Sequence, residues 1–265
     1  MAKLSISKAW DESRAIIARH GGLLATVALA LLVLPGVVSE LVSPETPQGQ
    51  FPPLGAWVIV AALAVLIGLV GQLAIIWLAM GSGASVGEAI RHGLRRAPSY
   101  IAATLIWTLP FGLAIFALMR GMTPGAPSPS VGLGLLILLP VLIFFVIRMI
   151  LTAPVAAAEE IGPIEIIKRS WRLSAGSWWR LFGFFAVLIV AALIVLAAAG
   201  VMVGILTRLL FGDVEPMSVG ALVVALVNQL AGAALTVVFI VMLARIYLQL
   251  AGDRSAEASV PTSGH

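Results

Sequence analysis

The chain of 265 residues has no cysteine, only three histidines and few charges. The absence of cysteine excludes disulfide bonds, thiol catalysis and thiolate metal sites. Charged residues make up 11% of the chain, against about a quarter of a soluble domain. Hydrophobic residues make up 61%, which is more than a water-soluble domain of this length can cover. The composition therefore predicts an all-α, polytopic integral membrane helix bundle.

Six apolar runs are long enough to cross a bilayer as helices, which takes about 20 mostly apolar residues. These runs are Leu23–Val42, Leu54–Met80, Tyr100–Met119, Val131–Leu151, Leu181–Leu206 and Val219–Ala244. The first run follows about 20 residues that carry both signs of charge, and no A-x-A-like cleavage site comes after it. We therefore interpret it as a retained span rather than a secretory signal.

Lysine and arginine are distributed unevenly between the two ends of these spans. Arg120 and Arg208 lie on one side, and the other 14 of the 16 Lys and Arg residues lie on the opposite side or just inside it. The positive-inside rule then predicts both termini in the cytoplasm and a multi-pass protein of the inner (plasma) membrane. The resulting basic collar suits anionic phospholipid headgroups as partners. Nucleic acid is not an expected partner, because no soluble domain presents these charges.

Three amphipathic segments precede pairs of spans, and we expect each to form a cytoplasmic interfacial helix. The first covers residues 1–20 and is separated from its span by Gly21-Gly22, and the second covers 85–98 and is stopped by Pro98. The third begins at Gly162, and Glu165, Lys168, Arg169 and Arg172 share one arc of its helical wheel, with Ile, Leu and Trp on the rest.

The three amphipathic segments are spaced by about 80 residues, which suggests an internal repeat. The predicted repeat units are about 4–80, 85–152 and 162–250, within a single transmembrane domain of residues 1–252. Residues 253–265 are small and polar, and we expect a disordered C-terminal tail.

The stretch from Arg148 to Trp178 resembles the signature of the glycerophosphoryl diester phosphodiesterase membrane-domain family. The matching residues are Pro154-Val155, Glu159, Gly162-Pro163, Glu165, Ile167, Arg169-Ser170-Trp171, Leu173 and Gly176. In that family the membrane part can be attached to a soluble phosphodiesterase barrel, whereas this chain consists of spans and short loops. The resemblance therefore implies a membrane module associated with phospholipid-related processes, and it implies no catalytic activity.

Catalytic candidates are scarce. His20, His92 and His265 have no metal-ligand spacing with Asp or Glu, and no nucleophile elbow or phosphate-binding glycine loop is present. The adjacent pair Glu159-Glu160 points in two directions on a helix, and we interpret it as favourable charge near a helix N-terminus. We expect no catalytic residue, metal or cofactor, and we expect that the chain is not an enzyme.

Two groups of residues are candidates for binding. Basic and aromatic residues of the collar can contact lipid headgroups, with Arg suited to bidentate phosphate contacts and Trp to the membrane interface. They are Arg91, Arg95, Arg96, Arg148, Lys168, Arg169, Arg172, Trp171, Trp178 and Trp179. The polar residues within spans are Gln72, Asn228 and Gln229, which can bind a substrate or join helices.

These observations favour a non-enzymatic module that binds or organises phospholipid at the cytoplasmic leaflet, and that assists lipid handling. One alternative is a transporter of small solutes or lipids that uses the level of Gln72, Asn228 and Gln229. Another is a structural subunit with a membrane-protein partner.

Overall fold

The computed structural model describes residues 5–44, 55–81, 83–120, 129–211 and 218–258. Within these ranges the chain is helical and contains no strand. Six helical stretches are long and apolar enough to cross a membrane: Ile6–Val42, Ala56–Ala79, Val86–Leu118, Val131–Ala158, Trp178–Leu209 and Val219–Gly252. The predicted all-α polytopic architecture and the six predicted spans are therefore confirmed.

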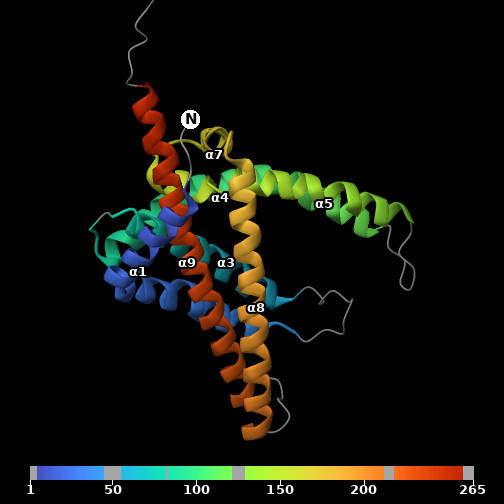
Figure 1. Cartoon of the computed structure of the whole chain (residues 1–265). Helices are drawn as coiled ribbons and strands as arrows, with labels where there is room; N and C mark the ends of the chain where they lie inside the picture. The colour runs from blue at the N-terminus through green and yellow to red at the C-terminus, as the bar shows by residue number, and fades with distance from the viewer. Residues whose placement is uncertain (1–4, 45–54, 82, 121–128, 212–217, 259–265) are drawn as a thin grey trace, which may run out of the picture.

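The long helices form three hairpins (Figure 1). In the first, α1 (Ile6–Ala28), the π-helical turn η1 (Leu29–Val33) and α2 (Leu34–Val42) run against α3 (Ala56–Ala79). The second pairs α4 (Val86–Arg120) with α5 (Pro129–Met149), and the third pairs α8 (Trp178–Phe211) with α9 (Val219–Ala258). Two short helices, α6 (Thr152–Ala158) and α7 (Pro163–Ser174), connect the second hairpin to the third.

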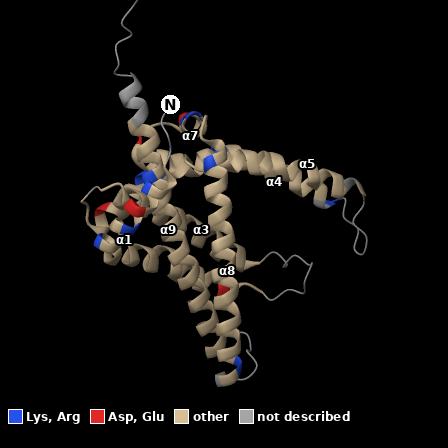
Figure 2. Ribbon diagram, viewed as in Figure 1, with Lys and Arg blue, Asp and Glu red and all other residues tan. Residues whose placement is uncertain are grey.

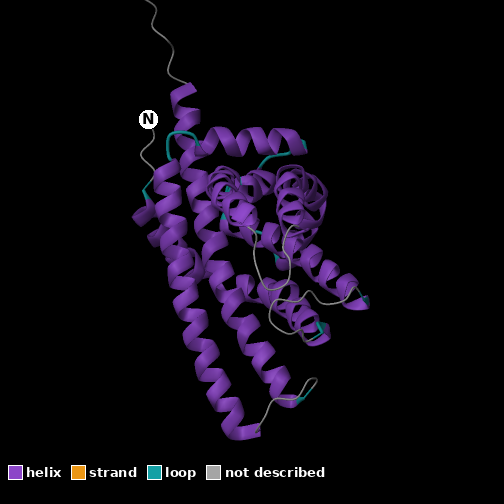
Figure 3. Cartoon of the chain, turned by 90° about the vertical axis from the view of Figure 1, so that its right-hand side faces the viewer, coloured by secondary structure: helices purple, strands orange, loops and turns teal. Residues whose placement is uncertain are grey.

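The hairpins diverge from a common end. In Figure 1 the α4–α5 hairpin extends sideways while the α8–α9 hairpin runs down the page, and Figure 3 shows the first of these nearly end-on. We call the common end the core end, because the largest cluster of buried residues lies there. It contains the C-terminal half of α3, most of α6 and the C-terminal half of α9. Helix α3 is central, since it contacts α1, α2, α4, α6 and α9.

Small residues allow the helices around α3 to approach closely. A Cβ added at Gly93 of α4 would lie 2.6 Å from the carbonyl oxygen of Val70, and one added at Gly71 would lie 2.8 Å from the Leu31 side chain. Beside Gly93, the ring of His92 stacks on Trp77 with centroids 4.4 Å apart, and its Nε2 donates to the Ala157 carbonyl over 2.7 Å. These contacts fix α3, α4 and α6 at the core end.

The first two predicted interfacial segments have different outcomes. The first ends where expected, because α1 consists of two helical parts that meet in a kink at His20, next to Gly21-Gly22, and the φ of −117° and ψ of 15° at His20 are not helical. Pro98 does not stop the second segment, because α4 continues past Pro98 and Pro110. A proline can remain inside a long helix when packing compensates for the lost hydrogen bond. The third segment, α7, is a separate helix.

Charges are concentrated at the core end, as the collar pattern predicted (Figure 2). Arg245 of α9 donates from Nε to Glu12 of α1 over 2.9 Å, and this ion pair joins the first hairpin to the third. Arg120 and Arg208 lie in the last turns of α4 and α8, at the opposite ends of their hairpins. The predicted tail begins differently, since α9 continues to Ala258, and residues 259–265 lie outside the described residues.

Candidate functional site

Helix α7 is placed by sequence signals at both of its ends. Pro163 occupies the first helical position, and the backbone N–H of Gly162 donates to Glu165 Oε2 over 3.4 Å, as in a capping box. After Ser174 the chain reverses at Gly176, whose φ of 85° is in the left-handed region that glycine adopts without strain. Helix α7 therefore lies across the core end and packs against α4, α5 and α6.

The residues of α7 differ in burial along its two faces, and Ile164 of the predicted apolar face is exposed. Ile166, Ser170 and Leu173 are buried, while Lys168 and Arg172 are exposed. Trp171 is partly exposed, and its ring packs edge-on against Phe144 and Phe145 of α5. The basic residues of α7 thus face outward, next to an aromatic wall.

Arg148 in the last turn of α5 lies behind that wall. Its backbone carbonyl accepts hydrogen bonds from Ser170 Oγ over 2.8 Å and from Ser174 Oγ over 3.3 Å. Its guanidinium carbon lies 4.9 Å from the ring centroid of Trp171 and 5.3 Å from that of Phe144. Two helices and an aromatic pair therefore hold the arginine in place.

The guanidinium of Arg148 lacks acceptors. Its Nε and Nη1 atoms are buried, and neither has a hydrogen-bond partner among the described residues. The indole Nε1 of Trp178, whose ring lies 5.8 Å from that of Phe144, is also buried without a partner. Leaving a donor buried and unpaired costs about 1–3 kcal/mol, and more when it is charged. The cation–π contacts stabilise the guanidinium by about 0.5–2 kcal/mol, but they do not supply the missing hydrogen-bond acceptor.

A hollow of about 480 Å³ opens beside this cluster. It is lined by Ile167, Lys168, Trp171 and Arg172 of α7. Two exposed cations, Lys168 and Arg172, thus share this hollow with Trp171, and Arg148 does not line it but lies against the Trp171 ring. We call Arg148, Lys168, Trp171, Arg172 and Trp178 the Arg148 site. Oxygen acceptors with negative charge, such as those of a phosphate group, fit its donors.

Two of the predicted headgroup residues have internal partners. Arg169 Nε donates to Glu159 Oε1 over 2.8 Å, and the hydroxyl of Tyr247 in α9 donates to the same oxygen over 2.8 Å. Arg96 Nη2 of α4 donates to Glu160 Oε1. Glu159 and Glu160 thus point in two directions, as expected, but they join α6 to three other helices rather than only flanking a helix start. Sequence reasoning missed Tyr247, which lies 88 positions from Glu159.

The remaining predicted headgroup residues are Arg91, Arg95 and Trp179, and Trp179 contacts the Arg148 site through Trp178. Arg91 and Arg95 are exposed on α4. Trp179 is 76% exposed at the start of α8, where its ring packs edge-on against Trp178. Within the described ranges, no group of three or more His, Asp or Glu residues is placed to hold a metal ion.

The predicted intramembrane polar residues have separate partners. Gln72 of α3 accepts a hydrogen bond from the Tyr100 hydroxyl over 3.4 Å, whereas Gln229 of α9 donates to Glu40 Oε2 of α2 over 3.0 Å. Asn228 is half-buried on α9. Gln72 and Gln229 therefore connect different pairs of helices, which is the common use of such residues in membranes.

Comparison with known proteins identifies a family without a known activity. No curated protein and no solved structure matches the chain. The resemblance of Arg148–Trp178 to the glycerophosphoryl diester phosphodiesterase membrane domains is not tested by these comparisons. A family profile described as a domain of unknown function (DUF7847) matches residues 4–250, which is nearly the whole chain. The chain therefore belongs to the DUF7847 family.

Proposed function

We propose that this chain is a non-enzymatic membrane module that binds anionic phospholipid through the Arg148 site. The observation that carries the proposal is the pair of buried Nε and Nη1 donors of Arg148 that have no acceptor. Lys168 and Arg172 add positive charge in the hollow beside Trp171. Trp171 and Trp178 are of the residue type that prefers the boundary between headgroups and acyl chains, and Phe144 packs against both.

The chemistry of the site favours binding over a reaction. Its groups are donors and aromatic rings, and none of them is a nucleophile or a general base for phosphodiester hydrolysis. A phosphate oxygen can accept from the guanidinium, and the lipid tail can remain in the bilayer. With the positive-inside orientation, the bound headgroup belongs to the cytoplasmic leaflet of the inner membrane, and both termini lie in the cytoplasm.

The alternatives have less support. Gln72 and Gln229 already bond to neighbouring helices, so no observation favours a transport site at their level. A membrane-protein partner is compatible with the large apolar surface of the hairpins, but lipid explains that surface equally well.

The test is mass spectrometry of lipids retained on the gently purified chain, compared with the lipids of the source membrane. We expect enrichment of anionic phospholipid, and we expect Arg148→Gln to reduce it several-fold. Arg208→Gln serves as the matched control, because Arg208 lies in the last turn of α8, away from the core end. A retained pool that matches the source membrane, or equal retention in both variants, contradicts the proposal.

A further inference from the structure

Three hollows share one lining residue of α9. Val238 lines a hollow over the N-terminal part of α1, a groove between α1 and α9, and a groove between α8 and α9. Their volumes are about 540, 450 and 310 Å³. Each is in the range of about 300–1,000 Å³ that is typical of ligand pockets. None shares a lining residue with the hollow of the Arg148 site.

The first hollow has a mostly apolar lining, and we call it the polar hollow because it also carries charged side chains. It is lined by Trp10, Asp11, Ser13 and Arg14 of α1 together with Ile17 and Val238. No ion pair of Asp11 or Arg14 is recorded among the described residues, although both are exposed. Ser13 is committed elsewhere, since its Oγ donates to the Ala9 carbonyl over 2.6 Å. The hollow thus offers one cation, one anion and one indole.

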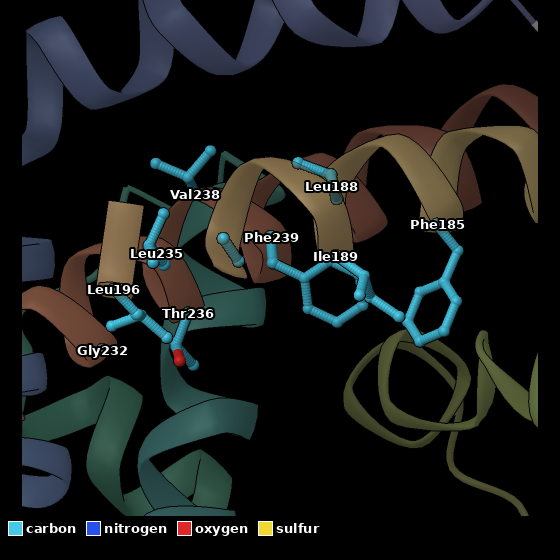
Figure 4. Close-up of a pocket in the computed structure, with 10 residues that line it drawn as sticks. Phe185, Leu188, Ile189, Leu196, Gly232, Leu235, Thr236, Val238 and Phe239 are labelled. Carbon is cyan, nitrogen blue, oxygen red and sulfur yellow. The ribbon is translucent and has the colours of Figure 1, made fainter. Parts of the chain in front are cut away.

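The two grooves are apolar. The one between α1 and α9 shares Ile17 and Val238 with the polar hollow and continues along Leu24, Ala28 and Val33 toward the far end of the hairpin. The other is lined by Phe185, Leu188 and Ile189 of α8 and by Leu235, Thr236 and Phe239 of α9. Figure 4 shows these side chains spread along α8 and α9, with the Thr236 hydroxyl as the one polar group among those labelled.

We propose that this face binds one zwitterionic glycerophospholipid. Its headgroup occupies the polar hollow, and its two acyl chains occupy the grooves on either side of Val238. Arg14 binds the phosphate, Asp11 binds the ammonium group, and Trp10 adds a cation–π contact to that ammonium. The match between one Arg–Asp pair and a headgroup of two opposite charges distinguishes this site from the Arg148 site, whose lining charges are all positive. The inference therefore goes beyond the proposed function and stands or fails separately.

Glycines allow a sharp test. Gly21 lines the α1–α9 groove and Gly232 lines the α8–α9 groove, and an ideal Cβ at either position has open space around it. Gly21→Leu and Gly232→Leu fill the grooves without a backbone clash. Gly22 is the matched control for Gly21, because it is adjacent, lines neither groove and has the same open space. Gly200 of α8 is the corresponding control for Gly232.

The experiment is native mass spectrometry of the full chain with phosphatidylethanolamine, phosphatidylcholine or phosphatidylglycerol added in detergent. We expect the wild type to retain one ethanolamine or choline lipid, and Gly21→Leu, Gly232→Leu and Arg14→Gln each to reduce that occupancy several-fold. Gly22→Leu and Gly200→Leu should retain it. Phosphatidylglycerol binding should be unaffected by these five variants and reduced by Arg148→Gln.

Several results would overturn the inference. Equal occupancy in the groove-filling and control variants shows that the zwitterionic lipid is annular only. Preference for phosphatidylglycerol at a site sensitive to Gly21→Leu shows that Asp11 does not select the headgroup. Loss of zwitterionic lipid in Arg148→Gln, with Gly21→Leu and Gly232→Leu retaining it, shows that both lipids bind at the Arg148 site and also overturns the inference.

Discussion

The hydroxyl of Ser170 donates to the backbone carbonyl of Arg148 over 2.8 Å, so a residue of α7 caps the end of α5. Ser174 donates to the same carbonyl over 3.3 Å. The last carbonyls of a helix have no partner within the helix, and buried ones need a partner from elsewhere. These serines therefore donate hydrogen bonds to the end of α5 and hold its last turn, including Arg148, against α7.

This capping predicts a stability effect. Ser170→Ala should lower the free energy of unfolding by about 1 kcal/mol, the usual net value of a hydrogen bond. The Ser170→Ala/Ser174→Ala double variant should lose more, because either serine can partly replace the other. Ser13→Ala is the control, since that buried hydroxyl donates only within its own helix. Denaturant unfolding in detergent measures the difference, and equal losses for Ser13→Ala and the double variant would contradict the capping role.

Arg148→Met should separate stability from lipid binding. In lipid-free detergent the variant should be as stable as the wild type or more so, by about 1–3 kcal/mol, because it removes buried unpaired donors. Added phosphatidylglycerol should raise the melting temperature of the wild type and leave that of Arg148→Met almost unchanged.

The comparison for that experiment is Arg172→Met. Arg172 is exposed, so its replacement should change lipid-free stability by no more than about 0.5 kcal/mol. A strongly destabilised Arg148→Met protein in lipid-free detergent would show that the guanidinium stabilises the fold itself.

The oxygen shared by Arg169 and Tyr247 predicts coupling between α6, α7 and α9. Tyr247→Phe removes one of two donors to Glu159 Oε1 and should cost about 1 kcal/mol. A double-mutant cycle of Tyr247→Phe with Glu159→Gln should show a coupling energy of about 0.5–3 kcal/mol. Tyr100→Phe, whose hydroxyl makes only a 3.4 Å contact with Gln72, should cost less. Additive losses in the cycle would refute the coupling.

The close approach of α4 to α3 predicts a steric effect. Gly93→Ala places a Cβ 2.6 Å from the Val70 carbonyl oxygen, so the two helices must move apart at a cost of about 1–3 kcal/mol. Gly87→Ala on the same helix meets open space and should be neutral or stabilising. Thermal unfolding of both variants measures the contrast, and similar melting temperatures would show that the α3–α4 contact is looser.

The parts of the fold that sequence predicts are those set by composition and local pattern. The six spans follow from the length of the apolar runs, and the start of α7 follows from Gly162, Pro163 and Glu165. The break expected at Gly21-Gly22 is matched by the kink at His20, whereas the break expected at Pro98 was wrong, because α4 continues past that residue.

The candidate site was predictable only as a list of residue types. The basic and aromatic residues could be named, but whether each is free or paired depends on contacts between distant segments. The sequence alone does not show that Arg169, unlike Arg172, is paired. That difference depends on Glu159, whose Oε1 accepts from both Arg169 and Tyr247. Arg148 could be named as a residue that contacts headgroups, but its position beside Phe144 and Trp171, with two of its guanidinium nitrogens buried, could not be predicted. Such enclosure depends on the crossing of α5, α7 and α8.

The α4–α5 and α8–α9 hairpins diverge, so the angle between them can change with the thickness of the bilayer (Figure 1). Large apolar side chains such as Leu109, Leu136 and Ile137 are exposed along the α4–α5 hairpin, so its tilt depends on the surrounding lipid more than on neighbouring helices. A thinner membrane increases that tilt. Because Ser170 joins the end of α5 to α7, a change in the tilt of α5 reaches the exposed cations Lys168 and Arg172 of α7.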